Sequence, residues 1–61
     1  MEDPRYIITR IDQAKSRERQ FLSDIDRLKR ENPVNRAAVA QKEGYLADVR
    51  REIRDLESKL R

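Results

Sequence analysis

The direction of the chain is decided near its middle, where residues 28–35 read Leu-Lys-Arg-Glu-Asn-Pro-Val-Asn. Pro33 has no backbone N–H, and its ring disfavours a helical conformation for the residue before it, so a preceding helix should stop at about Arg30. Asn32 is a favoured N-cap residue, and proline is favoured directly after a cap. The stretch therefore predicts that one helix ends and a second begins across a turn at about residues 31–34.

Outward from this turn, both halves of the chain have the composition of long helices. One glycine and two prolines occur among 61 residues, and 44% of the residues are charged. Asp3 followed by Pro4 repeats the pattern of a cap and a first helical residue. We therefore expect an all-α chain that forms a single hairpin domain over residues 1–61, with helices over about residues 4–30 and 33–60.

Hydrophobic residues recur in both predicted helices at alternating steps of four and three. This 3.5-residue spacing is typical of a coiled-coil seam, in which side chains of one helix pack into holes on the other. Two polar residues, Glu18 and Lys42, interrupt the pattern. The predicted seam contains Ile7, Ile11, Phe21, Ile25, Leu28, Val39, Leu46, Val49, Ile53, Leu56 and Leu60, together with Ala14.

An antiparallel coiled coil is consistent with this pattern if residues equidistant from a point between residues 33 and 34 face each other. Ala14 then faces Ile53, a small residue against a larger one, which fills a layer without a void. Among the flanking charges, Arg17 and Glu52 are the clearly complementary pair. The other flanking positions bring like charges together, so we expect most of these side chains to face water or an acidic partner.

A continuous helix is the alternative to a hairpin. The heptad frame runs through the middle of the chain, so a single rod could dimerise along its whole length. A proline inside a helix costs about 3 kcal/mol, and no apolar seam residue occurs between Leu28 and Val39. These two observations favour the hairpin.

A lone hairpin leaves apolar surface uncovered, because Ile8 and Leu22 widen the stripe of the first helix beyond one seam. We therefore expect the hairpin to pair with a second copy as an antiparallel four-helix bundle, or to dock on another helical protein. Glu18 would then reach Lys42 of the other copy, or both would extend to water. The expected partner surface contains Ile8, Leu22, Tyr45, Arg50, Arg51 and Arg54.

The composition also argues against several classes of function. The chain has no Cys and no His, so thiolate and imidazole metal sites and His-dependent catalysis lack their central residues. We expect no cofactor, no metal and no enzymatic activity, because two helices cannot enclose a pocket. The net charge is +3, but acidic residues alternate with basic ones, so nucleic acid is not a favoured partner and a membrane surface is less favoured still. Without a secretory leader, the expected location is the cytoplasm.

A local resemblance suggests a second class of function. Residues 28–32, the Ala37-Ala38 pair, Gly44-Tyr45 and residues 53–60 resemble the coiled-coil finger of Gre-type transcript-cleavage factors. In that family, acidic residues at the tip of the finger enter the RNA polymerase secondary channel and help to hold a catalytic magnesium ion. The resemblance implies this role for Asp26 and Glu31, although Arg30 is an extra residue and a proline lies at the tip.

The sequence thus favours a small non-enzymatic interaction module that acts by helix–helix docking, as an adaptor, inhibitor or co-chaperone. The residues around the turn also resemble type III secretion needle subunits and their small helical co-chaperones. The alternative is a protein that binds a transcription complex or nucleic acid, with a Gre-like hairpin in the polymerase channel as the specific case.

Overall fold

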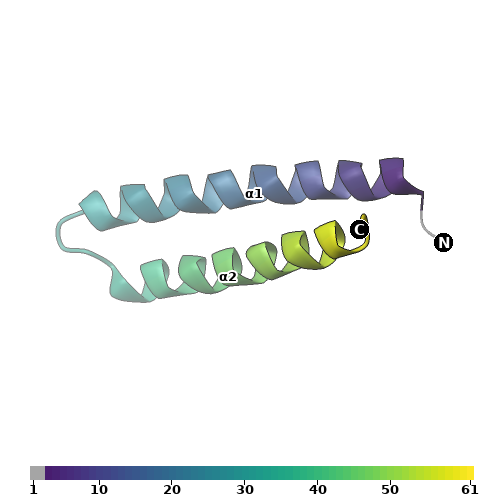
Figure 1. Ribbon diagram of the computed structural model, residues 1–61. Helices are drawn as coiled ribbons and strands as arrows, with labels where there is room; N and C mark the ends of the chain where they lie inside the picture. Colours follow the sequence, from purple (N-terminus) through teal and green to yellow (C-terminus); the bar gives the residue numbers. More distant parts are fainter. Residues whose placement is uncertain (1–2) are drawn as a thin grey trace.

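The computed structural model describes residues 3–61, which form two long helices that lie side by side and run in opposite directions (Figure 1). Helix α1 spans Pro4–Arg30 and helix α2 spans Arg36–Ser58. The start of α1 and the C-terminus lie at the same end of the hairpin, and the molecule measures 49 × 14 × 12 Å. The hairpin expected from the sequence is confirmed, and the alternative of a continuous helix is wrong.

Helix α1 begins and ends as its sequence predicts. The Asp3 carboxylate accepts a hydrogen bond from the backbone N–H of Arg5 at 2.9 Å, and Pro4 occupies the first helical turn. At the other end, the Glu31 N–H donates to the Leu28 carbonyl at 3.3 Å. Three basic residues in the last turn are favourable there because the helix C-terminus carries partial negative charge: Arg27, Lys29 and Arg30.

Helix α2 begins three residues later than the sequence suggests. Its N-cap is Asn35, whose side-chain oxygen accepts from the backbone N–H of Ala38 at 3.1 Å, so the assignment of Asn32 as the cap is wrong. The later cap leaves residues 31–35 to span the gap between the helices, a length typical of helix–helix connections. A helix beginning at Pro33 would have left only two residues for the reversal.

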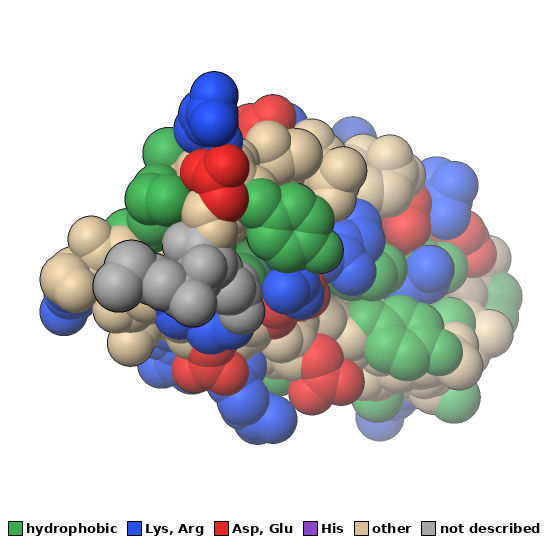
Figure 2. Space-filling model, turned by 90° about the vertical axis from the view of Figure 1, so that its right-hand side faces the viewer, with side chains coloured by type: hydrophobic (Ala, Val, Ile, Leu, Met, Phe, Trp, Pro, Cys, Tyr) green, Lys and Arg blue, Asp and Glu red, His purple; other side chains and the backbone are tan. Residues whose placement is uncertain are grey.

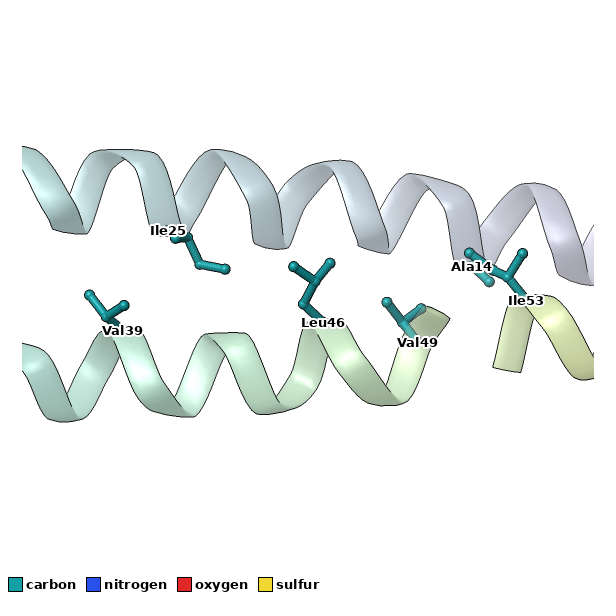
Figure 3. Close-up of a cluster of buried hydrophobic side chains, with 6 residues drawn as sticks. All are labelled: Ala14, Ile25, Val39, Leu46, Val49 and Ile53. Carbon is teal, nitrogen blue, oxygen red and sulfur yellow. The ribbon is translucent and has the colours of Figure 1, made fainter. Parts of the chain in front are cut away.

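The core is one seam between the helices. Figure 3 shows its larger cluster, in which Ala14 and Ile53 lie together and Ile25 points between Val39 and Leu46. Phe21 and Leu28 pack on this cluster with part of their surface exposed. The buried residues of both clusters are Ile7, Ile11, Ala14, Ile25, Val39, Leu46, Val49, Ile53 and Leu56.

Most of the residues that the heptad spacing assigns to the seam are buried between the helices, and Phe21 and Leu28 are partly buried. Leu60 differs, because it is 42% exposed. Helix α2 ends at Ser58, and the last residues form a turn in which each backbone N–H donates to the carbonyl three residues earlier, with Leu60 exposed. The seam therefore closes at Leu56, which packs with Ile7 and Ile11.

Candidate interaction surface

The two edges of the seam differ in how they are covered. We call the closed edge the side that contains Phe21 and Asp24 of α1 with Lys42, Tyr45 and Glu52 of α2. We call the open edge the opposite side, which contains Ile8, Lys15 and Leu22 of α1 with Arg50 and Arg54 of α2. The edges follow from the heptad frame, since the two groups flank opposite sides of the same seam.

The closed edge is covered by two aromatic rings and one lysine. The ring centroids of Phe21 and Tyr45 are 5.8 Å apart, at an interplanar angle of 40°. The Lys42 ammonium lies 5.7 Å from the Phe21 centroid and 5.9 Å from the Tyr45 centroid, within the range of cation–π attraction. Its Nζ is also 3.4 Å from Asp24 Oδ2, which joins the helices. Lys42 is thus accommodated at the edge of the seam.

Asp24 is the one titratable group here with a clearly perturbed pKa. The side-chain amide of Gln20 donates to Asp24 Oδ1 at 2.9 Å, and this bond favours the ionised carboxylate. The Lys42 ammonium and the Arg27 guanidinium act in the same direction, while partial burial opposes them. The net result is that the pKa of Asp24 lies below the ordinary value for aspartate.

Farther along the closed edge, Glu52 binds two arginines of α1. Arg17 Nη2 lies 3.0 Å from Glu52 Oε2, which confirms the complementary pair expected from the register. Arg10 Nη2 lies 3.6 Å from the other oxygen of the same carboxylate. Such exposed pairs contribute about 0.2–1 kcal/mol each, so they align the helices more than they stabilise them.

On the open edge, the ion pair between the helices is Glu18 with Arg50. The Arg50 Nε donates to Glu18 Oε2 at 3.0 Å. Both polar seam residues are therefore paired within one chain, Glu18 with Arg50 and Lys42 with Asp24, and neither pair was expected from the sequence, which suggested a Glu18–Lys42 contact between copies or extension to water. Each observed pair joins a seam residue to a flanking residue of the other helix.

The open edge also carries shallow hollows and exposed aliphatic side chains. One hollow of about 350 Å³ is lined by Glu18, Arg50, Ile53 and Arg54. A second of about 330 Å³ is lined by Ile8, Thr9, Ile11, Asp12 and Lys15. The side chains of Ile8 and Leu22 are 55% and 43% exposed. This edge therefore presents apolar surface beside the seam.

The structure divides the partner surface expected from the sequence between the two edges. Ile8, Leu22, Arg50 and Arg54 lie together on the open edge, as the hollows and the heptad frame indicate. Tyr45 packs against Phe21 on the closed edge. Arg51 lines a hollow on that same side and lies 3.8 Å from Asp48.

The tip of the hairpin has acidic residues but no clustered acidic site. Asp26 is paired with Arg30, four residues later, at 2.9 Å. Within residues 3–61, no group of three or more His, Cys, Asp or Glu side chains is arranged to hold a metal ion. At the end of the hairpin that carries the termini, Figure 2 shows basic and acidic side chains interspersed. Neither helix α1 nor helix α2, which lie within the described part of the chain, has an apolar stretch sufficient for a membrane span.

Comparisons with protein-family models, with curated proteins and with solved structures find no match to this chain. The functional argument therefore rests on the hairpin itself.

Proposed function

We propose that the chain is a small non-enzymatic protein–protein interaction module that docks helix against helix through its open edge. Its simplest partner is a second copy, with which it completes an antiparallel four-helix bundle, and its proposed setting is the cytoplasm. The observation that carries the proposal is the exposure of Ile8 and Leu22 on that edge, where Ile8 also lines one of its shallow hollows.

The energetics of a two-helix unit support this role. A chain below about 70–80 residues rarely gains more than about 3–5 kcal/mol from a single core. Among residues 3–61, no large side chain is completely enclosed, because the seam is one layer deep. Burying an exposed Leu or Ile side chain contributes about 1.5–3 kcal/mol, so covering the open edge would add a substantial fraction of the total stability.

Another helical protein could occupy the same edge, which is how an adaptor, inhibitor or co-chaperone would act. Arg50 and Arg54 flank the apolar surface and would supply polar contacts at the rim of such an interface. The nucleic-acid alternative has less support, because acidic residues pair with many of the basic ones, including Arg17 and Arg30.

The proposal is tested by sedimentation equilibrium of the chain and of two variants matched in exposure. Leu22 and Val34 are each 43% exposed, but Leu22 lies on the open edge and Val34 lies in the turn. We expect the unmodified chain to dimerise at micromolar concentration, Leu22→Gln to weaken the dimer at least tenfold, and Val34→Gln to leave it unchanged.

An unmodified chain that stays monomeric at all protein concentrations measured would remove self-association from the proposal. A dimer that is equally sensitive to both variants would show that the open edge is not its docking surface.

A further inference from the structure

The open edge of α1 carries a second heptad stripe whose two halves complement each other when one copy is reversed. The stripe runs along α1 at alternating steps of three and four: Ile8, Ile11, Lys15, Glu18, Leu22 and Ile25. Residues equidistant from a point between residues 16 and 17 form matching layers. Ile11 and Ile25 are mostly buried against α2, so each offers only its remaining exposed edge to a second copy. In this register Ile8 meets Ile25, Leu22 meets Ile11 and Lys15 meets Glu18, so each layer is either apolar with apolar or basic with acidic.

The shape of this surface is also self-complementary, because a hollow on one copy matches a projecting side chain on the other. Ile8, Ile11, Asp12 and Lys15 line the 330 Å³ hollow, and this spacing defines the four corners of a hole in knobs-into-holes packing. Leu22, a residue that is 43% exposed, is the corresponding knob. In the reversed arrangement, Leu22 of the second copy lies over the centre of this hollow, between positions 11 and 12.

The charges beside the stripe follow the same symmetry. Every seventh residue along its outer flank alternates in sign, from Arg5 to Asp12 to Arg19 to Asp26. In an antiparallel coil, the flanking residues that face each other are equidistant from a point one residue away from the centre of the seam. Inside the hairpin, Arg17 and Glu52 follow this rule, since they are equidistant from a point between residues 34 and 35. Applied to the stripe, that rule pairs Asp12 with Arg19 of the second copy and Arg5 with Asp26.

Helix α2 does not offer an equivalent surface. The α2 positions that correspond to Ile8, Lys15 and Leu22 in the heptad frame are all charged: Arg36, Glu43, Arg50 and Glu57. The exposed large apolar residue within α2 is Tyr45, which packs with Phe21 on the closed edge. The Glu18 carboxylate already accepts from Arg50 through Oε2, and its second oxygen remains able to accept from a lysine.

We infer that the occupant of the open edge is a second copy of this chain, with the two α1 helices antiparallel and Leu22 of each copy seated in the Ile8–Lys15 hollow of the other. The inference rests on the proposed function, since it specifies which partner docks there and in which register.

A charge exchange at Asp12 and Arg19 tests this register without changing the core, because both side chains are exposed. Asp12→Arg places two arginines opposite each other twice in the dimer, and Arg19→Asp does the same with two aspartates. Each single variant should weaken self-association about tenfold or more. An equimolar mixture of the two variants restores complementary pairs, so it should associate as heterodimers, and the double variant should dimerise as the unmodified chain does.

Asp55→Arg is the matched control, because Asp55 lines a hollow on the closed edge and the variant has the same charge change as Asp12→Arg. It should leave the dimer constant unchanged in sedimentation equilibrium, with helix content checked by circular dichroism. If the unmodified chain dimerises but the single variants do so equally well, or if mixing them restores nothing, the register is wrong while the proposed function stands. An unmodified chain that does not self-associate overturns both the register and the homodimer.

Discussion

At the residue scale, Glu18 and Lys42 show how a single seam tolerates charge. Both occupy heptad positions that normally hold apolar side chains, yet each reaches an edge of the hairpin and finds an opposite charge there. No buried side-chain nitrogen or oxygen in residues 3–61 lacks a hydrogen-bond partner. Because the seam is narrow, the charged end of a long side chain in the seam can extend to the edge of the hairpin. A deeper core would not allow this.

The lowered pKa of Asp24 predicts how the stability of the fold depends on pH. The pKa is lowered in the folded chain by the Gln20 hydrogen bond and by Lys42, whereas in the unfolded chain it returns to the ordinary aspartate value. The ionised carboxylate therefore stabilises the fold above that pH, and the contribution is lost as the pH falls through the lowered value. Asp24→Asn should lower the melting temperature at neutral pH and reduce its dependence on pH below about 4.

Melting curves of Asp24→Asn and of Asp55→Asn, recorded by circular dichroism from neutral to acidic pH, provide the measurement and its control. Asp55 is an exposed carboxylate of α2 and takes no part in the Asp24–Lys42 contact. Equal acid dependence in the unmodified chain and in Asp24→Asn would contradict this assignment.

At the element scale, the start of α2 depends on which asparagine caps it. Loss of an N-cap side chain costs about 0.5–2 kcal/mol. Asn35→Ala should destabilise the hairpin by about 1 kcal/mol because the Ala38 N–H loses its acceptor. Asn32→Ala, three residues earlier in the turn, should change the free energy of unfolding by less than about 0.5 kcal/mol.

Urea unfolding of both variants at one fixed protein concentration measures the difference. A larger loss in the free energy of unfolding from Asn32→Ala than from Asn35→Ala would indicate that Asn32 is the cap of α2.

The two helices also show which elements the sequence predicts well. The seam spacing and the register follow from residue kind, because the pairing that places Ala14 against Ile53 also brings most of the other apolar seam residues of the two helices opposite each other. The start of α2 does not follow, because Asn32 and Asn35 are equally good caps and the choice depends on the distance that the turn must span. The exposure of Leu60 was missed for a similar reason, since the heptad frame gives no signal for where the helix ends.

The candidate surface was predictable only in part. Ile8 and Leu22 are evident from the sequence because they fall beside the seam in the heptad frame. The separation of Tyr45 from them is not evident, because it depends on which side of the seam each flank occupies and on the Phe21 contact. The Glu18–Arg50 pair likewise requires side-chain geometry that residue spacing does not supply.

At the scale of the whole molecule, helix–helix docking and phosphate binding predict opposite responses to salt. Apolar contacts persist when salt screens charge, whereas affinity for nucleic acid falls steeply as counterions compete. The melting temperature should therefore rise with protein concentration, by mass action, at both low and high salt. Melting curves over about a hundredfold range of concentration test this expectation.

Titration with a labelled RNA or DNA duplex under the same conditions supplies the opposing measurement. Tight, salt-sensitive nucleic-acid binding together with a melting temperature independent of concentration would favour the transcription-related alternative.

The start of α1 and the C-terminus lie at one end of the hairpin, and this has a mechanical consequence (Figure 1). Tension applied between them pulls the helices apart sideways, so the load falls first on Ile7 and Leu56 and reaches Val39 last. The seam layers would separate one after another, so that each layer in turn carries the whole force. A hairpin gripped at its two ends should therefore open at a far smaller pull than the same helices dragged past each other lengthwise.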